Sequence, residues 1–181
     1  MNKAYIKHFD RYLDRMCEEI RPLLCTNGGN VIMVQCENEY GYYGDDKEYL
    51  EYLREGYIRR GMDVPLFTSD GSSEDNLLDG FIPGTLTTLN FGSRVEENFR
   101  AHNKLFPDQP KMCMEMWNGW FDAWGEEHHT TSPEKAGAEL DELAEYAEVI
   151  KYNTIHQFTV MDLNHLHRGG RVSKATAIVG T

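Results

Sequence analysis

The chain has 181 residues, of which 40% are hydrophobic and 12% aromatic, and this composition indicates a globular protein with one core. The 30 acidic and 18 basic residues give a formal net charge of −12, which disfavours binding to nucleic acid and to anionic membrane surfaces. No segment reaches the roughly 20 apolar residues that cross a bilayer. Residues 1–5 lack the apolar core of a signal peptide, so the compartment stays unknown.

Helices and strands are predicted in alternation along the first half of the chain. Apolar residues recur every three or four positions over residues 5–24, which is typical of one buried helix face. Residues 31–35 form an apolar run that predicts a strand buried on both faces. Helical spacing resumes over residues 45–61, and a second strand is predicted at residues 63–68. A polar turn at residues 69–72 and a loop of mixed character follow.

The second half repeats this order. A third strand is predicted at residues 85–91, and Ser93 with Glu96 forms a capping-box signature for a helix that reaches about Phe106. A fourth strand is predicted at residues 111–117, and Ser132-Pro133 begins a helix whose apolar stripe continues to Ile150. Residues 154–160 are a candidate fifth strand.

The alternation of strands and helices, without hairpin signals, indicates parallel strands joined by crossover helices. A closed barrel of eight such units needs about 250 residues. The sequence therefore predicts an α/β fold that is either part of a (β/α)₈ barrel or an open sheet.

Carboxylates stand at the ends of two predicted strands. Glu37 and Glu39 follow the first strand, and Glu115 lies near the end of the fourth, beside the aromatic loop that contains Trp117 and Trp120. Parallel strands place their ligands at this end. Glycoside hydrolysis uses two carboxylates, one as acid and base and one as nucleophile, whose carboxyl groups lie about 5–5.5 Å apart in retaining enzymes. The pattern favours this chemistry.

A plainer interpretation is that Glu37 and Glu39 are solvated turn residues and that Glu115 only ends a strand. Against it, a glutamate between Met114 and Met116 would be costly to bury without a partner or a catalytic purpose. Strand alternation does not separate Glu37 from Glu39, so both stay candidates for the acid on this reasoning.

Four motifs in the same order resemble glycoside hydrolase family 35, the β-galactosidase family. They are VIMVQCENEYGYYG at residues 31–44, VPLFTSDG at 64–71, NFG at 90–92 and MEMWNGWFDAWG at 114–125. The resemblance covers about residues 29–150. It implies a (β/α)₈ TIM barrel, of which this chain would supply about strands four to eight with their helices.

The resemblance also implies roles for single residues. Glu39 would be the general acid and base at the end of strand four, and Glu115 the nucleophile on strand seven. Asn38 would bind a sugar hydroxyl, and Trp120 would be the tryptophan of the galactose pocket. The family motif, and not the strand pattern, is what favours Glu39 over Glu37. Asp70 and Asn90 receive no role.

The implied reaction is hydrolysis of terminal β-galactosides with retention, without cofactor or metal. Residues 1–153 would be a partial catalytic domain and residues 154–181 a divergent tail, because the family's usual eighth-strand motif has no counterpart there. The missing remainder of the barrel would be the partner, and the isolated chain is expected to be inactive.

Two other functions stay open. A non-catalytic carbohydrate-binding or structural remnant would keep the aromatic side chains but not the turnover. Another retaining glycosidase on the same barrel, such as a β-glycanase, would also carry an Asn-Glu pair. The loop at residues 117–125 matches the galactosidase pattern and disfavours it.

Histidines and cysteines give weaker signals. Metal sites can be drawn at residues 126–129 (Glu126, Glu127, His128, His129) or from His165 and His167, but adjacent histidines rarely converge on one ion. His102 is expected at the surface or half-buried. The four cysteines show no metal spacing and are expected to be free thiols: Cys17, Cys25, Cys36 and Cys113.

Overall fold

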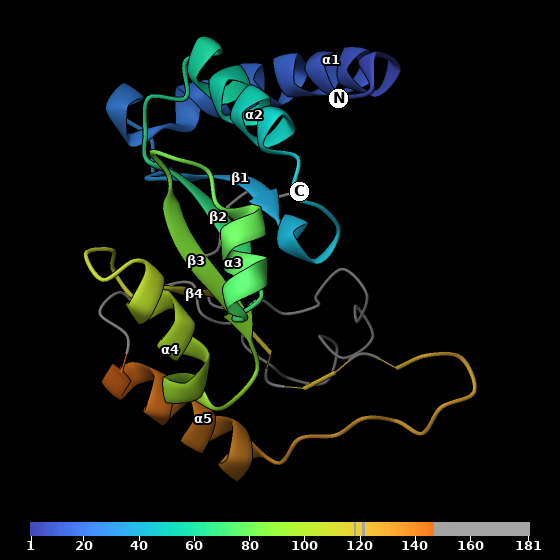
Figure 1. The fold of residues 1–181 in the computed structure, drawn as a ribbon. Helices are drawn as coiled ribbons and strands as arrows, with labels where there is room; N and C mark the ends of the chain where they lie inside the picture. Colours follow the sequence, from blue (N-terminus) through green and yellow to red (C-terminus); the bar gives the residue numbers. More distant parts are fainter. Residues whose placement is uncertain (118, 121, 147–181) are drawn as a thin grey trace. The chain divides into compact units, whose positions relative to one another are not determined.

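The computed structural model describes residues 1–117, 119–120 and 122–146 (Figure 1). The chain divides into two compact units. The described part of the first comprises residues 1–71 and 75–87, and that of the second comprises residues 72–74 and 88–146. The predicted strand at 154–160, the tail at 154–181 and the predicted end of the last helix near Ile150 lie outside the described residues.

The first unit alternates helices and strands as predicted. Its elements are α1 (Lys3–Ile20), β1 (Val34–Asn38), α2 (Lys47–Arg59), β2 (Leu66–Asp70) and α3 (Glu74–Gly80). The first residue of α3, Glu74, is assigned to the second unit. Side-chain oxygens bind the first free backbone N–H groups of both long helices. The side chain of Asn2 accepts hydrogen bonds from the first turn of α1, and Asp46 accepts one from the N–H of Tyr49 in α2 at 3.0 Å.

The core of the first unit lies between its helices and its strands. In Figure 1, α1 and α2 lie side by side and cover one face of β1. Fully buried leucines of α1 and α2 meet the buried side chains of β1 and β2, and this apolar burial supplies the main stabilising free energy of the layer. The residues at its centre are Leu13, Cys17, Val34, Cys36, Leu50, Leu53, Tyr57 and Leu66.

β1 and β2 pair in parallel, and β1 carries a bulge. The partners are Val34 with Leu66, Gln35 with Phe67, Glu37 with Thr68 and Asn38 with Ser69, so Cys36 is an additional residue without a partner of its own in this register. The strand begins later than predicted. Ile32, 61% exposed, precedes it, so the expected burial of the whole run on both faces is wrong.

The second unit repeats the strand-helix order. It contains most of β3 (Leu86–Phe91), then α4 (Val95–Leu105), β4 (Cys113–Met116) and α5 (Pro133–Tyr146). β3 and β4 are parallel, with Leu89 beside Cys113, Asn90 beside Glu115 and Phe91 beside Met116. The rings of Phe99 and Tyr146 stack, with centroids 5.7 Å apart, and this contact joins α4 to α5.

Two elements differ from the sequence prediction near residue 70. The predicted polar turn at residues 69–72 begins too early, because β2 continues through Ser69 and Asp70. The loop expected afterwards contains helix α3. At seven residues this helix is too short to show a periodic apolar stripe.

The predicted capping box of α4 is wrong. The residue before the helix is Arg94, in the left-handed region at φ 54°, and it makes no side-chain capping hydrogen bond. The N–H of Val95 instead donates to the carboxylate of Glu142 on α5, at 3.1 Å. The acceptor thus lies 47 residues further along the chain, so the sequence around residues 93–96 does not indicate it.

His102 is fully buried, which corrects the expected surface or half-buried position. Its ring packs between Phe99 and Phe106, with centroid distances of 5.9 and 5.7 Å. It is a core residue of the second unit.

Two parallel strand pairs are each connected by a helix: α2 connects β1 to β2, and α4 connects β3 to β4. The predicted α/β class is confirmed, and these units are consistent with part of a (β/α)₈ barrel. Among the residues that the structure describes, no helix is both long and apolar enough to cross a membrane.

Candidate active site

The bulge in β1 decides which side chains share a face. Without it, Gln35 and Asn38 would point to opposite faces, because side chains alternate along a regular strand. With Cys36 as the additional residue, the side-chain amide of Gln35 donates to Oδ1 of Asn38 at 3.0 Å. Asn38 is exposed at the end of the strand. Gln35 therefore holds the side-chain amide of Asn38, the group expected to bind a sugar hydroxyl, and both residues lie on the same face of β1.

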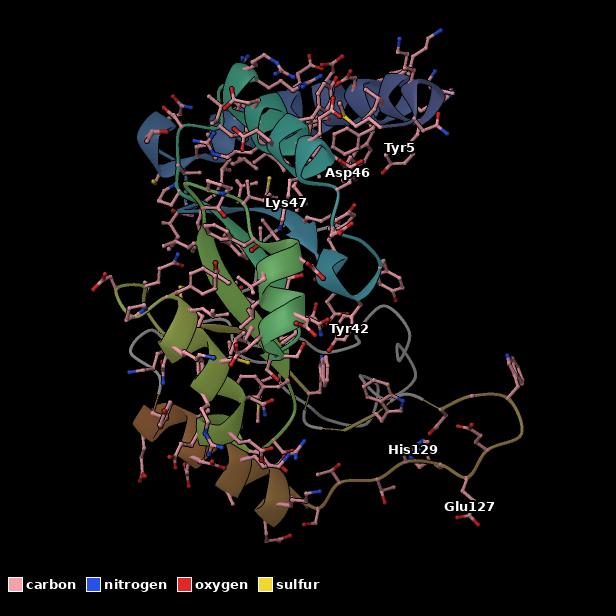
Figure 2. All side chains as sticks on the ribbon, viewed as in Figure 1. Tyr5, Tyr42, Asp46, Lys47, Glu127 and His129 are labelled. Carbon is pink, nitrogen blue, oxygen red and sulfur yellow. The ribbon has the colours of Figure 1, made fainter. Side chains whose placement is uncertain are left out.

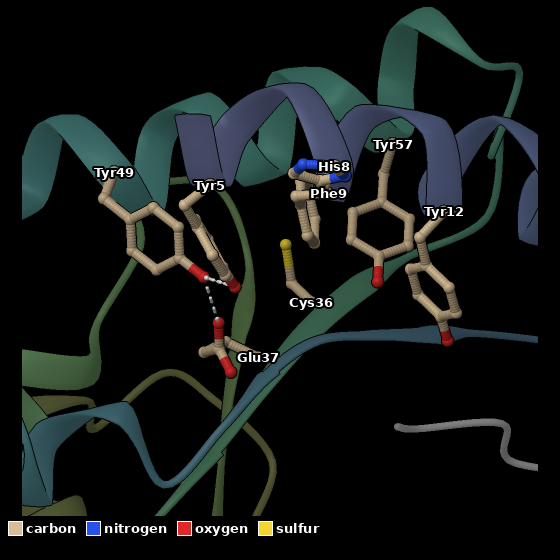
Figure 3. Close-up of a pocket in the computed structure, with 8 residues that line it drawn as sticks. All are labelled: Tyr5, His8, Phe9, Tyr12, Cys36, Glu37, Tyr49 and Tyr57. Carbon is tan, nitrogen blue, oxygen red and sulfur yellow. Dashed lines mark hydrogen bonds between the residues drawn. The ribbon is translucent and has the colours of Figure 1, made fainter. Parts of the chain in front are cut away.

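Glu37 points to the other face, into the helix layer. The hydroxyl of Tyr49 on α2 donates to Oε2 of Glu37 at 3.1 Å, and the Tyr5 hydroxyl of α1 lies 3.3 Å from that of Tyr49 (Figure 3). Burial and these contacts raise the pKa of Tyr49, so it stays a neutral donor. Glu37 borders a cavity of about 340 Å³, whose other lining residues are Tyr5, His8, Phe9, Tyr12, Cys36, Tyr49 and Tyr57.

Glu39 follows the strand in a turn. Its backbone is left-handed, at φ 54°, which costs about 1–2 kcal/mol for a residue other than glycine. The N–H of Glu39 donates to the carbonyl of Ser69 at 2.7 Å, and its carbonyl accepts from the N–H of Tyr42 at 3.1 Å. The half-buried Glu39 thus leaves β1 in a direction that backbone contacts impose.

Asp70 is a residue of this region to which the sequence assigned no role. It ends β2, only 1% exposed, and its Oδ1 accepts the N–H of Gly41 at 3.1 Å. Burial raises the pKa of Asp70 to about 6; the Gly41 N–H opposes this rise, and Glu37 and Glu39 add to it. The sequence signal was the TSDG motif, but the predicted turn there concealed the burial.

Lys47 is the cation that faces Asp70. Its ammonium group donates to the carbonyls of Leu78, Asp79 and Phe81 at the end of α3, the last two at 2.8 and 3.3 Å. Figure 2 labels Lys47 at the start of α2. A cation at this end of a helix is stabilised by the helix dipole. Burial lowers the pKa of Lys47, while Asp79 and Asp70 favour its charged form.

Glu115 lies on β4 in the second unit, half-buried. The indole N–H of Trp117 donates to Oε2 of Glu115 at 3.1 Å, which fixes the orientation of the carboxylate. The ring of Trp117 meets that of Trp120 edge to face, at 5.6 Å between centroids, and Trp120 is 48% exposed. Asn90 is the partner of Glu115 in the strand ladder and is buried.

These contacts bring the predicted residues together in two groups. Asn38 and Glu39 are adjacent in the first unit, and Glu115 and Trp120 lie around Trp117 in the second. Carboxylates at the carboxyl ends of parallel strands can donate or accept protons, or attack an electrophilic carbon. Exposed tryptophan faces suit the apolar side of a sugar ring.

The histidines of the aromatic loop bind one carboxylate. Nδ1 of His128 lies 2.5 Å from Asp122 and Nδ1 of His129 lies 3.2 Å from it, and the backbone N–H of His129 with these rings lowers the pKa of Asp122 to about 2. Within residues 1–117, 119–120 and 122–146, no three His, Cys, Asp or Glu side chains converge as metal ligands. His165 and His167 lie outside the described residues.

The four cysteines are free thiols, as predicted. Burial raises the pKa of Cys36 and of Cys113 to about 12, so these thiols are inert at neutral pH. Cys25 is exposed.

Parallel strands that end in carboxylates beside aromatic side chains are typical of α/β proteins that act on carbohydrates. The chain belongs to glycosyl hydrolases family 35, which matches residues 1–161. The match includes α1, which precedes the four motifs, and extends beyond Asn153.

Curated relatives support the same family. The β-galactosidase of Xanthomonas manihotis is 43% identical over 132 residues, which are 72% of this chain and 22% of that protein. Human β-galactosidase is 39% identical over 153 residues (82% and 23%), and mouse β-galactosidase-1-like protein 3 is 40% identical over 134 residues (74% and 20%). The chain spans about a fifth of the length of these relatives.

Proposed function

We propose that the chain supplies part of the catalytic barrel of a retaining β-galactosidase, about strands four to eight with their helices. β1 takes the place of strand four and β4 that of strand seven. Residues 1–153 form the partial catalytic domain and residues 154–181 a divergent tail. Family membership and the parallel strand-helix order support this assignment.

In the proposed reaction, Glu115 attacks the anomeric carbon of a terminal β-galactoside while Glu39 gives its proton to the departing glycosidic oxygen. The bond from sugar to oxygen breaks as the bond from sugar to Glu115 forms. Glu39, now ionised, takes a proton from water, and the resulting hydroxyl attacks the same carbon and releases Glu115. Two inversions leave the configuration retained.

The opposite orientation of Glu37 and Asn38 is the observation that carries the choice of acid. Glu37, the nearest rival, binds Tyr49 in the helix layer. Asn38 shares the other face of β1 with Gln35, and Glu39 follows it directly. This supports Asn38 as a ligand of a sugar hydroxyl and Glu39 as the acid.

The contacts of Glu115 support its role as nucleophile. A carboxylate that attacks carbon must present one oxygen in a fixed direction, and the indole of Trp117 holds the other oxygen. Trp120, half-exposed beside Trp117, offers a stacking face for galactose.

Chimaeras test the assignment, because the isolated chain is expected to be inactive. This chain replaces the matching segment of the Xanthomonas manihotis relative, and turnover of a chromogenic β-galactoside is measured. Glu115→Gln and Glu39→Gln should each lower kcat at least about a thousandfold, as expected for the loss of a group that acts in the transition state. Glu37→Gln is the matched control and should retain turnover. A loss with Glu37→Gln and none with Glu39→Gln would reverse the choice of acid.

Rescue by azide separates the two roles. In Glu115→Gly, azide enters the space of the nucleophile and should give the galactosyl azide with inverted configuration. In Glu39→Gly, azide replaces water in the second step and should give the product with retained configuration. The same configuration from both variants would contradict the assignment.

A non-catalytic carbohydrate-binding or structural remnant is the second candidate. The exposed ring of Trp120 beside Trp117 favours it, because sugar stacking needs no catalytic carboxylate. Titration of the isolated chain with galactose, followed by tryptophan fluorescence, should show binding if these aromatics suffice. Binding together with a chimaera that does not hydrolyse would favour the remnant.

We propose the outer edge of β1 as the place where the remainder of the barrel pairs. Within the described residues, β1 is the first strand of the sheet and β2 is its hydrogen-bonded neighbour, and Ile32, which precedes β1, is 61% exposed. Within residues 34–38, hydrogen exchange at the amides that point away from β2 should be slower in the chimaera than in the isolated chain, since an added strand would bind them. Equal exchange would contradict pairing at this edge.

A further inference from the structure

A buried carboxyl group lies beneath the turn that carries Glu39. Asp70 ends β2 with 1% of its surface exposed, whereas aspartate is rarely buried to this extent unless it has a partner. Its Oδ1 accepts the N–H of Gly41, two residues beyond Glu39. Asp70 itself is too buried to meet a substrate.

The turn is attached to the end of β2 at two consecutive residues. The N–H of Glu39 binds the carbonyl of Ser69 at 2.7 Å, and the N–H of Gly41 binds the carboxyl of Asp70 at 3.1 Å. Glu39 is left-handed at φ 54°, a conformation that persists only where its surroundings hold it. The two contacts therefore determine the direction in which Glu39 leaves the strand.

Two glycines make this arrangement possible. A Cβ on Gly80 of α3 would lie 2.2 Å from both carboxyl oxygens of Asp70. A Cβ on Gly41 would lie 2.1 Å from the backbone oxygen of Asn76. Contacts this short do not occur between real atoms. Residue 80 must therefore be glycine while the Asp70 carboxyl stays in place, and residue 41 must be glycine while the turn stays against α3.

We propose that Asp70 is a positioning residue for the general acid: its buried carboxyl group holds the turn at residues 39–41 and so orients Glu39. This inference deepens the proposed function and rests on it for the role of Glu39. The contact from Asp70 to Gly41 is itself independent of that role.

The hydrogen bond from the Gly41 N–H to the Asp70 carboxyl, here called the clamp, is sensitive to pH. Asp70 is faced by Glu37 on β1, Glu39 and Tyr42 in the turn, and Lys47 on α2, which also interacts with Asp79 on α3. Its pKa lies at about 6. An ionised carboxyl accepts a stronger hydrogen bond than a neutral one. The bond to Gly41 therefore strengthens as pH rises through about 6.

Nuclear magnetic resonance of the isolated 181-residue chain tests this without any assay of turnover. The side-chain carbon of Asp70 and the amide of Gly41 should titrate together, with one midpoint near pH 6. The protection of the Gly41 amide from exchange should rise about tenfold from one unit below the midpoint to one unit above it, the difference between a neutral and a charged hydrogen bond. A Gly41 amide that does not respond would overturn the proposal, and this measurement needs no variant.

Asp70→Asn is the informative variant, because asparagine keeps an acceptor oxygen but cannot ionise. The Gly41 titration should disappear in Asp70→Asn and persist in Asp75→Asn, a matched change at an exposed position on α3. If Gly41 titrates equally in both variants, Asp70 is not its cause and the proposal fails.

Turnover by the chimaera tests whether the clamp orients Glu39, the proposed general acid. Asp70→Asn should lower kcat about tenfold with little change in KM, and should alter the pH profile between about 5 and 7, whereas a merely structural defect would scale activity at every pH alike. Such uniform scaling would overturn the positioning role. A Gly41 titration in the chain together with a Glu39→Gln chimaera of normal kcat would refute the proposed function and leave the clamp intact.

Discussion

The two proposed catalytic carboxylates are held in different ways. Glu115 is part of a strand, so the ladder from Asn90 fixes its backbone and one indole N–H fixes its carboxylate. Glu39 stands one residue beyond a strand, in a left-handed turn that depends on Ser69 and Asp70. A strand position tolerates changes in its surroundings, whereas a turn position transmits them. Perturbations around β2 and α3 should therefore reach Glu39 much more readily than changes on α4 or α5 reach Glu115.

Gly41→Ala should give the largest effect. Its Cβ would overlap the backbone oxygen of Asn76, which cannot move as a side chain can, and we expect a loss of about 2–4 kcal/mol in the free energy of unfolding. Urea denaturation measures it. Gly137→Ala on α5 is the matched control, since nothing lies within 4 Å of its Cβ, and it should gain about 0.5–1 kcal/mol from helix propensity. Equal effects of the two changes would show that the turn is not tightly packed.

Asp70→Asn should change how stability depends on pH. The folded pKa of about 6 lies above the ordinary value of 3.8, so the folded state holds a proton that the unfolded state loses first. The stability contributed by neutral Asp70 is complete below about pH 4 and is lost as pH rises through 6. We expect the wild type to lose about 2–3 kcal/mol relative to Asp70→Asn over this window.

Thermal or urea unfolding at a series of pH values gives that difference. The other carboxylates titrate in both proteins and cancel. A parallel pH dependence of the two proteins would mean that Asp70 has an ordinary pKa.

Trp117→Phe should separate orientation from stability in the second region. The change removes the donor to Glu115 and keeps an aromatic ring against Trp120, so we expect kcat of the chimaera to fall about tenfold, the equivalent of one hydrogen bond. The free energy of unfolding should change by less than about 1 kcal/mol. Unchanged turnover would show that the strand alone orients the nucleophile.

Glu142→Ala should give the smallest effect. It removes the acceptor of the Val95 N–H at the start of α4, and the expected loss is about 1 kcal/mol, as for other capping groups. Glu145→Ala, an exposed position on the same helix, should stay within about 0.5 kcal/mol of the wild type. The comparison is made by urea denaturation, and a loss at Glu145 that equals the loss at Glu142 would argue against the cap.

Most elements followed from local patterns, and the errors have identifiable causes. The helical stripes at residues 5–24 and 45–61 and the four described strands lie close to their predicted places, because periodic burial is a local signal. The cap of α4 depends on Glu142 of α5, a tertiary contact that no local pattern shows. The burial of His102 had a local signal that the prediction did not use, because Phe99 and Phe106 lie three residues before it and four after it on the same helical face.

The candidate site shows the same division. Asn38, Glu39, Glu115 and Trp120 came from motifs, and their assigned roles stay predictions. The difference between Glu37 and Asn38 depends on a bulge, which arises from the pairing with β2 and leaves no mark in the run at residues 31–38. Asp70 belongs to the TSDG motif, but the motif does not indicate its burial. That burial depends on Gly80, which leaves space for the carboxyl, and on Gly41, which leaves space for the turn.

The bulge also bears on how length changes at this point should be interpreted. Because Cys36 is the additional residue, a chain without it would keep Gln35 and Asn38 on one face and lose only a thiol from the core. A chain that kept every residue but paired regularly would exchange Glu37 and Asn38 between the two faces. A single-residue gap at Cys36 in a homologue would thus leave Asn38 on the same face of β1. A change that only removed the bulge would place Glu37 on that face instead of Asn38.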